Sequence, residues 1–105
     1  MEQPNISYIH ILSGGDTVFE KKLIDIIKKE FPDEKEVYFN NMAEKKYKLA
    51  ADNVHKLKHK ISILGLEKGY ETAVAFENSL LEGSNDLKDE FESILSTITN
   101  YLQPL

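Results

Sequence analysis

The sequence lacks cysteine, which excludes disulfide bonds and metal sites built from thiolates. Its three prolines and five glycines are too few for a long linker or a low-complexity tail. No apolar run approaches the roughly 18 residues that a membrane-spanning helix needs, and the N-terminus does not have the pattern of a signal peptide. With a length of 105 residues, these absences predict one domain, residues 1–105, that is cytoplasmic and does not contact a membrane.

The net charge of −5 argues against general binding to nucleic acid. The charge is unevenly distributed along the chain. Residues 45–65 hold six lysines and a single acid, whereas the rest of the chain has seven lysines and seventeen acids. A lysine-rich helix face is often only a solvated surface, but this segment is also a candidate surface for an acidic partner.

Apolar residues recur every three or four positions through most of the chain, which predicts helices and no confident strand. The expected helices are 6–12, 17–30, 32–40, 44–64, 67–82 and 86 to about 101. Pro32 suits the first turn of a helix, so we expect a helix boundary there. Four of these helices are long and amphipathic, and their connections are short. The pattern therefore predicts an all-α fold, an antiparallel up-down four-helix bundle with one or two short additional N-terminal helices.

The predicted buried stripe of helix 44–64 consists of Tyr47, Ala50, Val54, Leu57, Ile61 and Leu64. His55 lies beside this stripe and not within it, so we expect its side chain at the surface. Its helix face carries Ala51, Lys58, His59 and Ser62. A neutral imidazole has a free lone pair and can act as a nucleophile near neutral pH. Lys58 could place a positive charge beside the oxygens of a phosphoryl group, and Ala51 would leave space for a partner. Taken alone, these residues also fit an ordinary exposed histidine beside a lysine.

Residues 51–65, with the sequence ADNVHKLKHKISILG, resemble the core motif of histidine-containing phosphotransfer (HPt) domains. In that family the phosphoacceptor histidine is followed by an apolar residue at +2, lysine at +3, usually glycine at +4, and glycine at +10. Here Leu57, Lys58 and Gly65 match, while His59 stands at +4. The resemblance extends over nearly the whole chain in the order and length of the helices.

The resemblance implies a phosphorelay intermediate of two-component signal transduction, with His55 as the phosphoacceptor. It implies that the protein is not an enzyme and has no cofactor, because the receiver partner brings Mg²⁺ and most of the catalytic groups. The implied partners are response-regulator receiver domains and a hybrid histidine kinase, and the expected state is a monomer. Residues expected to bind the phosphoryl group or the receiver are Ala51, Lys58, His59 and Ser62, together with an apolar patch of Tyr8 and Leu12 on the first helix.

His59 is the departure from the family motif. An imidazole is bulkier than the usual glycine, so it could narrow the choice of partner, slow transfer, or add a second cation when protonated. The alternative is a helical protein-interaction adaptor that has lost phosphotransfer through this change.

Two other sites that use histidine fit the sequence less well. His55 and His59 have the i, i+4 spacing of a zinc-binding pair, but His10 is the only other histidine and Lys56 replaces the glutamate of the usual His-Glu-x-x-His helix. We therefore expect no metal site. The dimerisation domain of a sensor histidine kinase would have an acid after the histidine and a proline nearby, and neither is present around His55.

Overall fold

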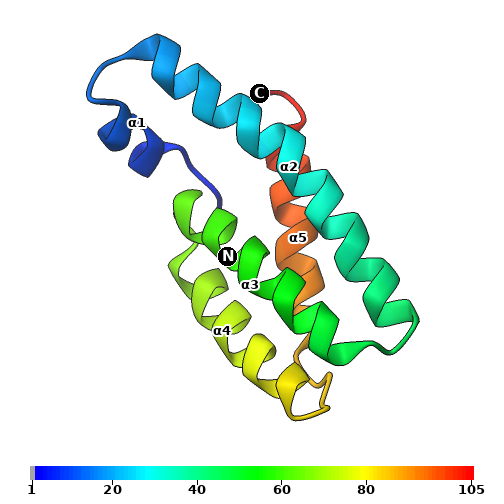
Figure 1. Ribbon diagram of the computed structural model, residues 1–105. Coiled ribbons are helices and arrows are strands. Elements are labelled where there is room, and N and C mark those ends of the chain that lie inside the picture. Colours follow the sequence, from blue (N-terminus) through cyan, green and yellow to red (C-terminus); the bar gives the residue numbers. More distant parts are fainter. Residues whose placement is uncertain (1) are drawn as a thin grey trace.

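The computed structural model describes residues 2–105, which fold into helices joined by short turns (Figure 1). The five helices are α1 (Ser7–Ser13), α2 (Thr17–Ala43), α3 (Tyr47–Ile63), α4 (Glu67–Leu81) and α5 (Lys88–Leu102). No strand occurs within residues 2–105, so the predicted all-α class is confirmed. None of the helices in this range is both long enough and apolar enough to cross a membrane.

The predicted helix boundary at Pro32 is wrong, because one continuous 27-residue helix, α2, includes this residue. Pro32 cannot donate the helical hydrogen bond to residue 28, and an interior proline costs about 3 kcal/mol relative to alanine. Burial on both sides of Pro32 offsets this cost. Phe31 and Tyr38 are 1% and 0% exposed, and burying a large apolar side chain contributes roughly 1.5–3 kcal/mol. Five helices therefore replace the six expected, and only one of them is short and N-terminal.

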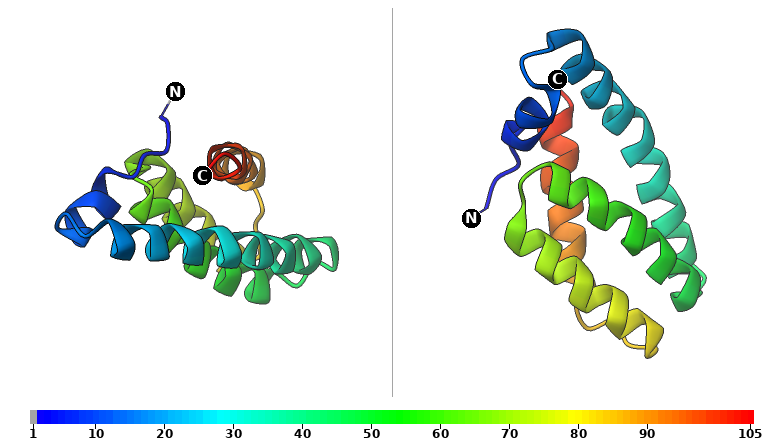
Figure 2. Two further views of the ribbon diagram at one scale, coloured as in Figure 1. Left: turned by 90° about the horizontal axis from the view of Figure 1, so that it is seen from above. Right: turned by 60° about the vertical axis from the view of Figure 1, so that its left-hand side comes forward.

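Helix α3 lies between α2 and α4, and α5 packs behind them (Figures 1 and 2). The predicted buried stripe of α3 is largely confirmed, since Val54, Leu57 and Ile61 are fully buried. Tyr47, at the start of the stripe, is only partly buried. Helix α3 therefore turns one face to the core and leaves the other available for contacts with solvent or a partner.

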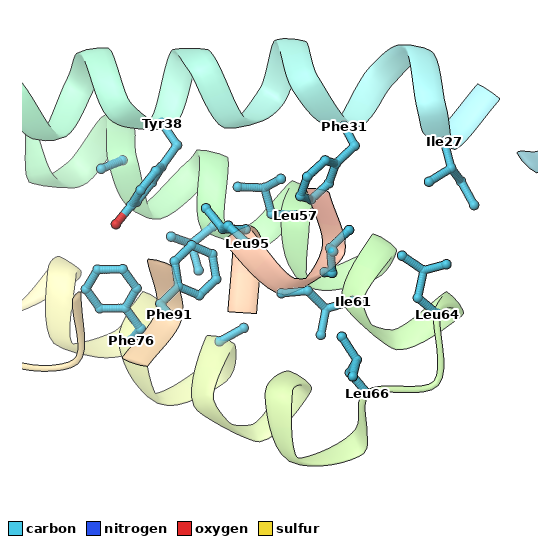
Figure 3. Close-up of a cluster of buried hydrophobic side chains, with 14 of the residues drawn as sticks. Ile27, Phe31, Tyr38, Leu57, Ile61, Leu64, Leu66, Phe76, Phe91 and Leu95 are labelled. Carbon is cyan, nitrogen blue, oxygen red and sulfur yellow. The ribbon is translucent and has the colours of Figure 1, made fainter. Parts of the chain in front are cut away.

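Helices α2 to α5 all contribute to one hydrophobic core (Figure 3). The ring centroid of Phe91 on α5 lies 5.3 Å from that of Tyr38 on α2 and 5.1 Å from that of Phe76 on α4. The Tyr38 hydroxyl is satisfied by donating to Glu92 Oε2 at 2.9 Å. Burial, together with this hydrogen bond to a carboxylate, raises the pKa of Tyr38.

Two glycines shape the connection between α3 and α4. Gly65, in the turn after α3, has a φ of +80°, and a Cβ there would lie 2.5 Å from Nδ2 of Asn5. Gly69, in the first turn of α4, faces α3, and a Cβ there would lie 3.2 Å from Cγ2 of Ile61. The turn and this close contact together fix how α4 is positioned along α3.

The N-terminal segment is attached to the far end of α3. The backbone N–H of Asn5 donates to the carbonyl oxygen of Leu64 at 2.8 Å, and Ile9 of α1 is fully buried. Asp16 caps α2, because its side chain accepts hydrogen bonds from two backbone N–H groups of the first turn, each at 3.1 Å. Helix α1 is thus held next to the end of α3 and the beginning of α2 (Figure 1).

Candidate functional site

His55 lies near the middle of α3, with 53% of its side chain exposed. The preceding residue, Val54, is fully buried. His55 therefore lies at the edge of the core-facing side of the helix, as its position beside the predicted buried stripe indicates. From this position the imidazole reaches across to the neighbouring helix α4.

Glu77 of α4 connects His55 and Lys58. Its Oε2 atom lies 3.1 Å from Nδ1 of His55, and its Oε1 atom lies 3.1 Å from Nζ of Lys58. The Nζ atom of Lys58 is also 3.3 Å from Nδ1 of His55. Sequence reasoning missed Glu77, because nothing in the sequence indicates which acid of the expected helix 67–82 would meet the histidine. The site is therefore a contact between two helices and not a feature of α3 alone.

The ammonium group of Lys58 can only donate, so its 3.3 Å approach to Nδ1 of His55 and the 3.1 Å contact of Nδ1 with Glu77 favour opposite tautomers. We assign the proton to Nδ1, because the Glu77 contact is the shorter of the two and a carboxylate has no proton to donate. A neutral imidazole with its proton on Nδ1 has its free lone pair on Nε2. The arrangement therefore presents Nε2 of a half-exposed histidine as a nucleophile.

Lys58 is not an ordinary solvated lysine of the helix surface. Its side chain is only 13% exposed, because Nζ is paired with Glu77 and lies 5.9 Å from the ring centroid of Tyr70. Long lysine stems commonly cover apolar surface while the ammonium group keeps a polar partner. Lys58 nevertheless brings a positive charge next to the imidazole of His55, as the motif implies.

The other expected residues of α3 have different environments. His59 and Ser62 are exposed, whereas Ala51 is 1% exposed and so offers almost no surface to a partner. The rings of His55 and His59 pack against each other at 88°, with their centroids 5.1 Å apart. The structure therefore places His59 in contact with His55, whereas Ala51 is buried below the surface of the helix.

Tyr8 and Leu12 lie on α1, with 49% and 51% exposure. Helix α1 is attached to α3 at Leu64, nine residues after His55 in the sequence, which is roughly 14 Å along a helix axis. The expected apolar patch is therefore exposed, but it is separated from His55 and does not form part of the same cluster of side chains.

The basic segment is partly neutralised by ion pairs, so its free charge is smaller than the sequence suggests. The pairs join Lys46 to Glu44 at 3.2 Å, Lys58 to Glu77 at 3.1 Å, and Lys60 to both Glu30 and Glu34 at 3.1 Å. In the part of the chain that the structure describes, no ion pair forms with Lys45, Lys48 or Lys56. These three lysines are the cations of the segment that remain available to a partner.

Two cavities lie away from His55. One, of about 300 Å³, is lined by α4, α5 and Glu2, and the other, of about 250 Å³, lies where Pro32 of α2 faces the end of α5. Among residues 2–105, no three histidine, aspartate or glutamate side chains are grouped so that they could hold a metal ion. The candidate site around His55 is therefore an exposed group of side chains that belongs to neither cavity.

No protein-family model matches this chain, and neither a curated protein nor a solved structure does. A functional assignment therefore depends on the chemistry of the site and on the motif around His55.

Proposed function

We propose that this chain is a phosphorelay intermediate of two-component signal transduction. His55 accepts a phosphoryl group from the aspartate of one receiver domain and passes it to another. The observation that carries this proposal is the 3.1 Å contact between Nδ1 of His55 and the carboxylate of Glu77. This contact supports a nucleophilic Nε2 on a side chain that another protein can reach.

The bundle geometry that we propose is antiparallel and up-down for α2 to α5, with α1 as the short additional helix. Connections of only three residues separate α2 from α3 and α3 from α4, and six separate α4 from α5. Connections this short favour helices that reverse direction at each turn. A histidine on the outside of such a bundle can meet the concave active site of a receiver.

The transfer step needs few groups from this chain. The Nε2 lone pair attacks phosphorus as the bond between phosphorus and the aspartyl oxygen breaks, and the aspartate leaves as a carboxylate with the bonding electron pair. The imidazole keeps its Nδ1–H and gains a positive charge, which faces the carboxylate of Glu77. The reverse reaction returns the phosphoryl group to a receiver by the same path.

Lys58 supports this chemistry through its charge. Its Nζ atom lies 3.3 Å from Nδ1 of His55, so an ammonium group stands at the edge of the ring away from Nε2. From there its positive charge would act across the ring on the negative charge of a phosphoryl group bound to Nε2. Glu77 keeps Lys58 in this position.

The partners in this proposal are receiver domains and a hybrid histidine kinase, and the chain acts as a cytoplasmic monomer. The receiver supplies Mg²⁺ and most of the catalytic groups, so the chain itself is a phosphotransfer protein and not an enzyme. Lys45, Lys48 and Lys56 favour an acidic surface around the receiver's aspartate. Tyr8 and Leu12 would add apolar contacts at the end of α3.

The test is incubation with a receiver domain that carries a radiolabelled aspartyl phosphate. Label that is acid-labile and alkali-stable should appear on this chain and should map to His55. His55→Gln should abolish the label without loss of helix content, whereas His10→Gln, which changes another exposed histidine, should leave it. Full labelling of the His55→Gln protein would disprove the assignment.

A second candidate function is favoured by the packing of His59 against His55. If the imidazole of His59 prevents a receiver from reaching His55 at all, the chain would be an adaptor that binds partners without phosphotransfer. Receiver binding that is the same for the original chain and for His55→Gln, with no label in either, would support the adaptor.

A further inference from the structure

Three neighbouring side chains contact the imidazole of His55. Glu77 and Lys58 occupy its Nδ1 edge, at 3.1 Å and 3.3 Å. His59, one helical turn further along α3, stands perpendicular to the ring, with the two centroids 5.1 Å apart. Even so, 53% of the His55 side chain remains exposed. The ring is therefore open to approach from a limited range of directions.

We propose that His59 is a steric gate that restricts which receiver domains can exchange phosphoryl groups with His55. This inference rests on the phosphotransfer function proposed above, and it assigns to His59 the selection of the partner and no part in the chemistry. The gate acts by volume, because the imidazole fills space beside His55 that the loops around a receiver's aspartate would otherwise enter.

The size of the phosphoryl donor determines whether His59 slows transfer to His55. The Nε2 lone pair lies in the plane of the ring, so a small donor needs access only along that direction. A receiver must fit its surface against the helix around His55 as well, and specific protein interfaces cover many side chains. Only receivers whose loops leave room for His59, or pack on its ring, would then react quickly.

The experiment compares a protein donor with a small donor on the same variants. Phosphoramidate is the small donor: Nε2 attacks its phosphorus, the P–N bond breaks, and ammonia leaves with the bonding electron pair. The protein donors are a panel of isolated receiver domains that carry aspartyl phosphate. The recipients are the original chain, His59→Ala, His59→Gly and His59→Phe, each checked for helix content.

His59→Ala should accelerate labelling by the poorly reactive receivers by about fivefold or more, and it should change the rate with phosphoramidate by a much smaller factor. His59→Gly should act in the same direction, although glycine also weakens the helix. His59→Phe restores bulk without a titratable group, so receivers should again be selected as in the original chain. If His59→Phe and the original chain select the same receivers, the volume of the side chain at position 59 is the cause of the selection.

Equal rates for all four proteins with every receiver would overturn the gate while leaving phosphotransfer intact. The gate would also be overturned if His59→Phe behaved like His59→Ala, because charge would then be the relevant property. A different result marks failure of the proposed function itself: no donor, phosphoramidate included, would place label on His55 in any of the four proteins.

Discussion

Glu77 on α4 accepts a hydrogen bond from Nδ1 of His55 on α3, with 3.1 Å between the two atoms. The other oxygen of the same carboxylate binds Nζ of Lys58, also at 3.1 Å. One acidic side chain therefore contacts both the histidine and the cation beside it, and it favours the tautomer with the proton on Nδ1. Glu77 is a positioning residue in the proposed reaction, since it acts through His55 and Lys58.

Glu77→Ala should slow transfer from a receiver by about tenfold or more, because each 1.4 kcal/mol of lost transition-state stabilisation is tenfold in rate. Without the acceptor, the imidazole divides between two tautomers, and only the Nδ1–H form leaves Nε2 free. The nitrogen chemical shifts of His55 measure this division directly. Glu71→Ala, at an exposed glutamate of the same helix, is the matched control. A tautomer ratio unchanged in Glu77→Ala would contradict the positioning role.

Lys58→Ala should lower the free energy of unfolding by about 1 kcal/mol or more, because the ion pair and the packing of the lysine stem are both lost. Lys58→Met keeps most of the stem, so its stability should lie closer to that of the original chain. Both variants should slow transfer, since both remove the charge beside His55. Urea unfolding measures the effect on stability, and transfer kinetics measure the effect of the lost charge. If Lys58→Ala were as stable as the original chain, the contact of Lys58 with Glu77 would not contribute to stability.

Pro32→Ala should stabilise the protein by about 1–3 kcal/mol, because it restores a hydrogen-bonded N–H inside α2. The gain is reduced because the unfolded chain becomes more flexible without proline. Denaturant unfolding measures the change, and Pro104→Ala, beyond the end of α5, should have almost no effect. Loss of stability in Pro32→Ala would mean that packing around the proline ring matters more than the missing hydrogen bond.

Glu2 caps the N-terminus of α4, where its carboxylate accepts hydrogen bonds from the backbone N–H groups of Lys68 and Gly69, each at 2.9 Å. Burial favours the neutral acid, but these hydrogen bonds outweigh it and lower the pKa of Glu2 below its ordinary value of 4.5. A depressed pKa contributes stability that is complete above pH 4.5 and is lost as the pH falls through the folded-state pKa.

Glu2→Gln should therefore have a lower melting temperature than the original chain at neutral pH. The two proteins should converge at pH values well below 4.5, where the glutamate is protonated in both the folded and the unfolded state. Melting curves across this range test the assignment. A difference that stayed constant with pH would show that the charge of Glu2 does not cause it.

Much of the fold can be predicted from local patterns. The spacing of Val54, Leu57 and Ile61 identifies the buried side of α3, because helical periodicity is a property of the sequence alone. The continuity of α2 cannot be predicted in this way. Proline favours a helix boundary locally, whereas the burial of Phe31 and Tyr38 on either side of it depends on helices that lie elsewhere in the chain.

The sequence by itself determined that His55 is exposed and that Lys58 and His59 lie beside it, because residues three and four apart share one face of a helix. It could not determine which acid meets the histidine. Helix α4 contains Glu67, Glu71 and Glu77, and the choice among them depends on how far α4 is shifted along α3. Only the tertiary structure decided this, because the turn after α3 and the packing of the two helices fix that shift.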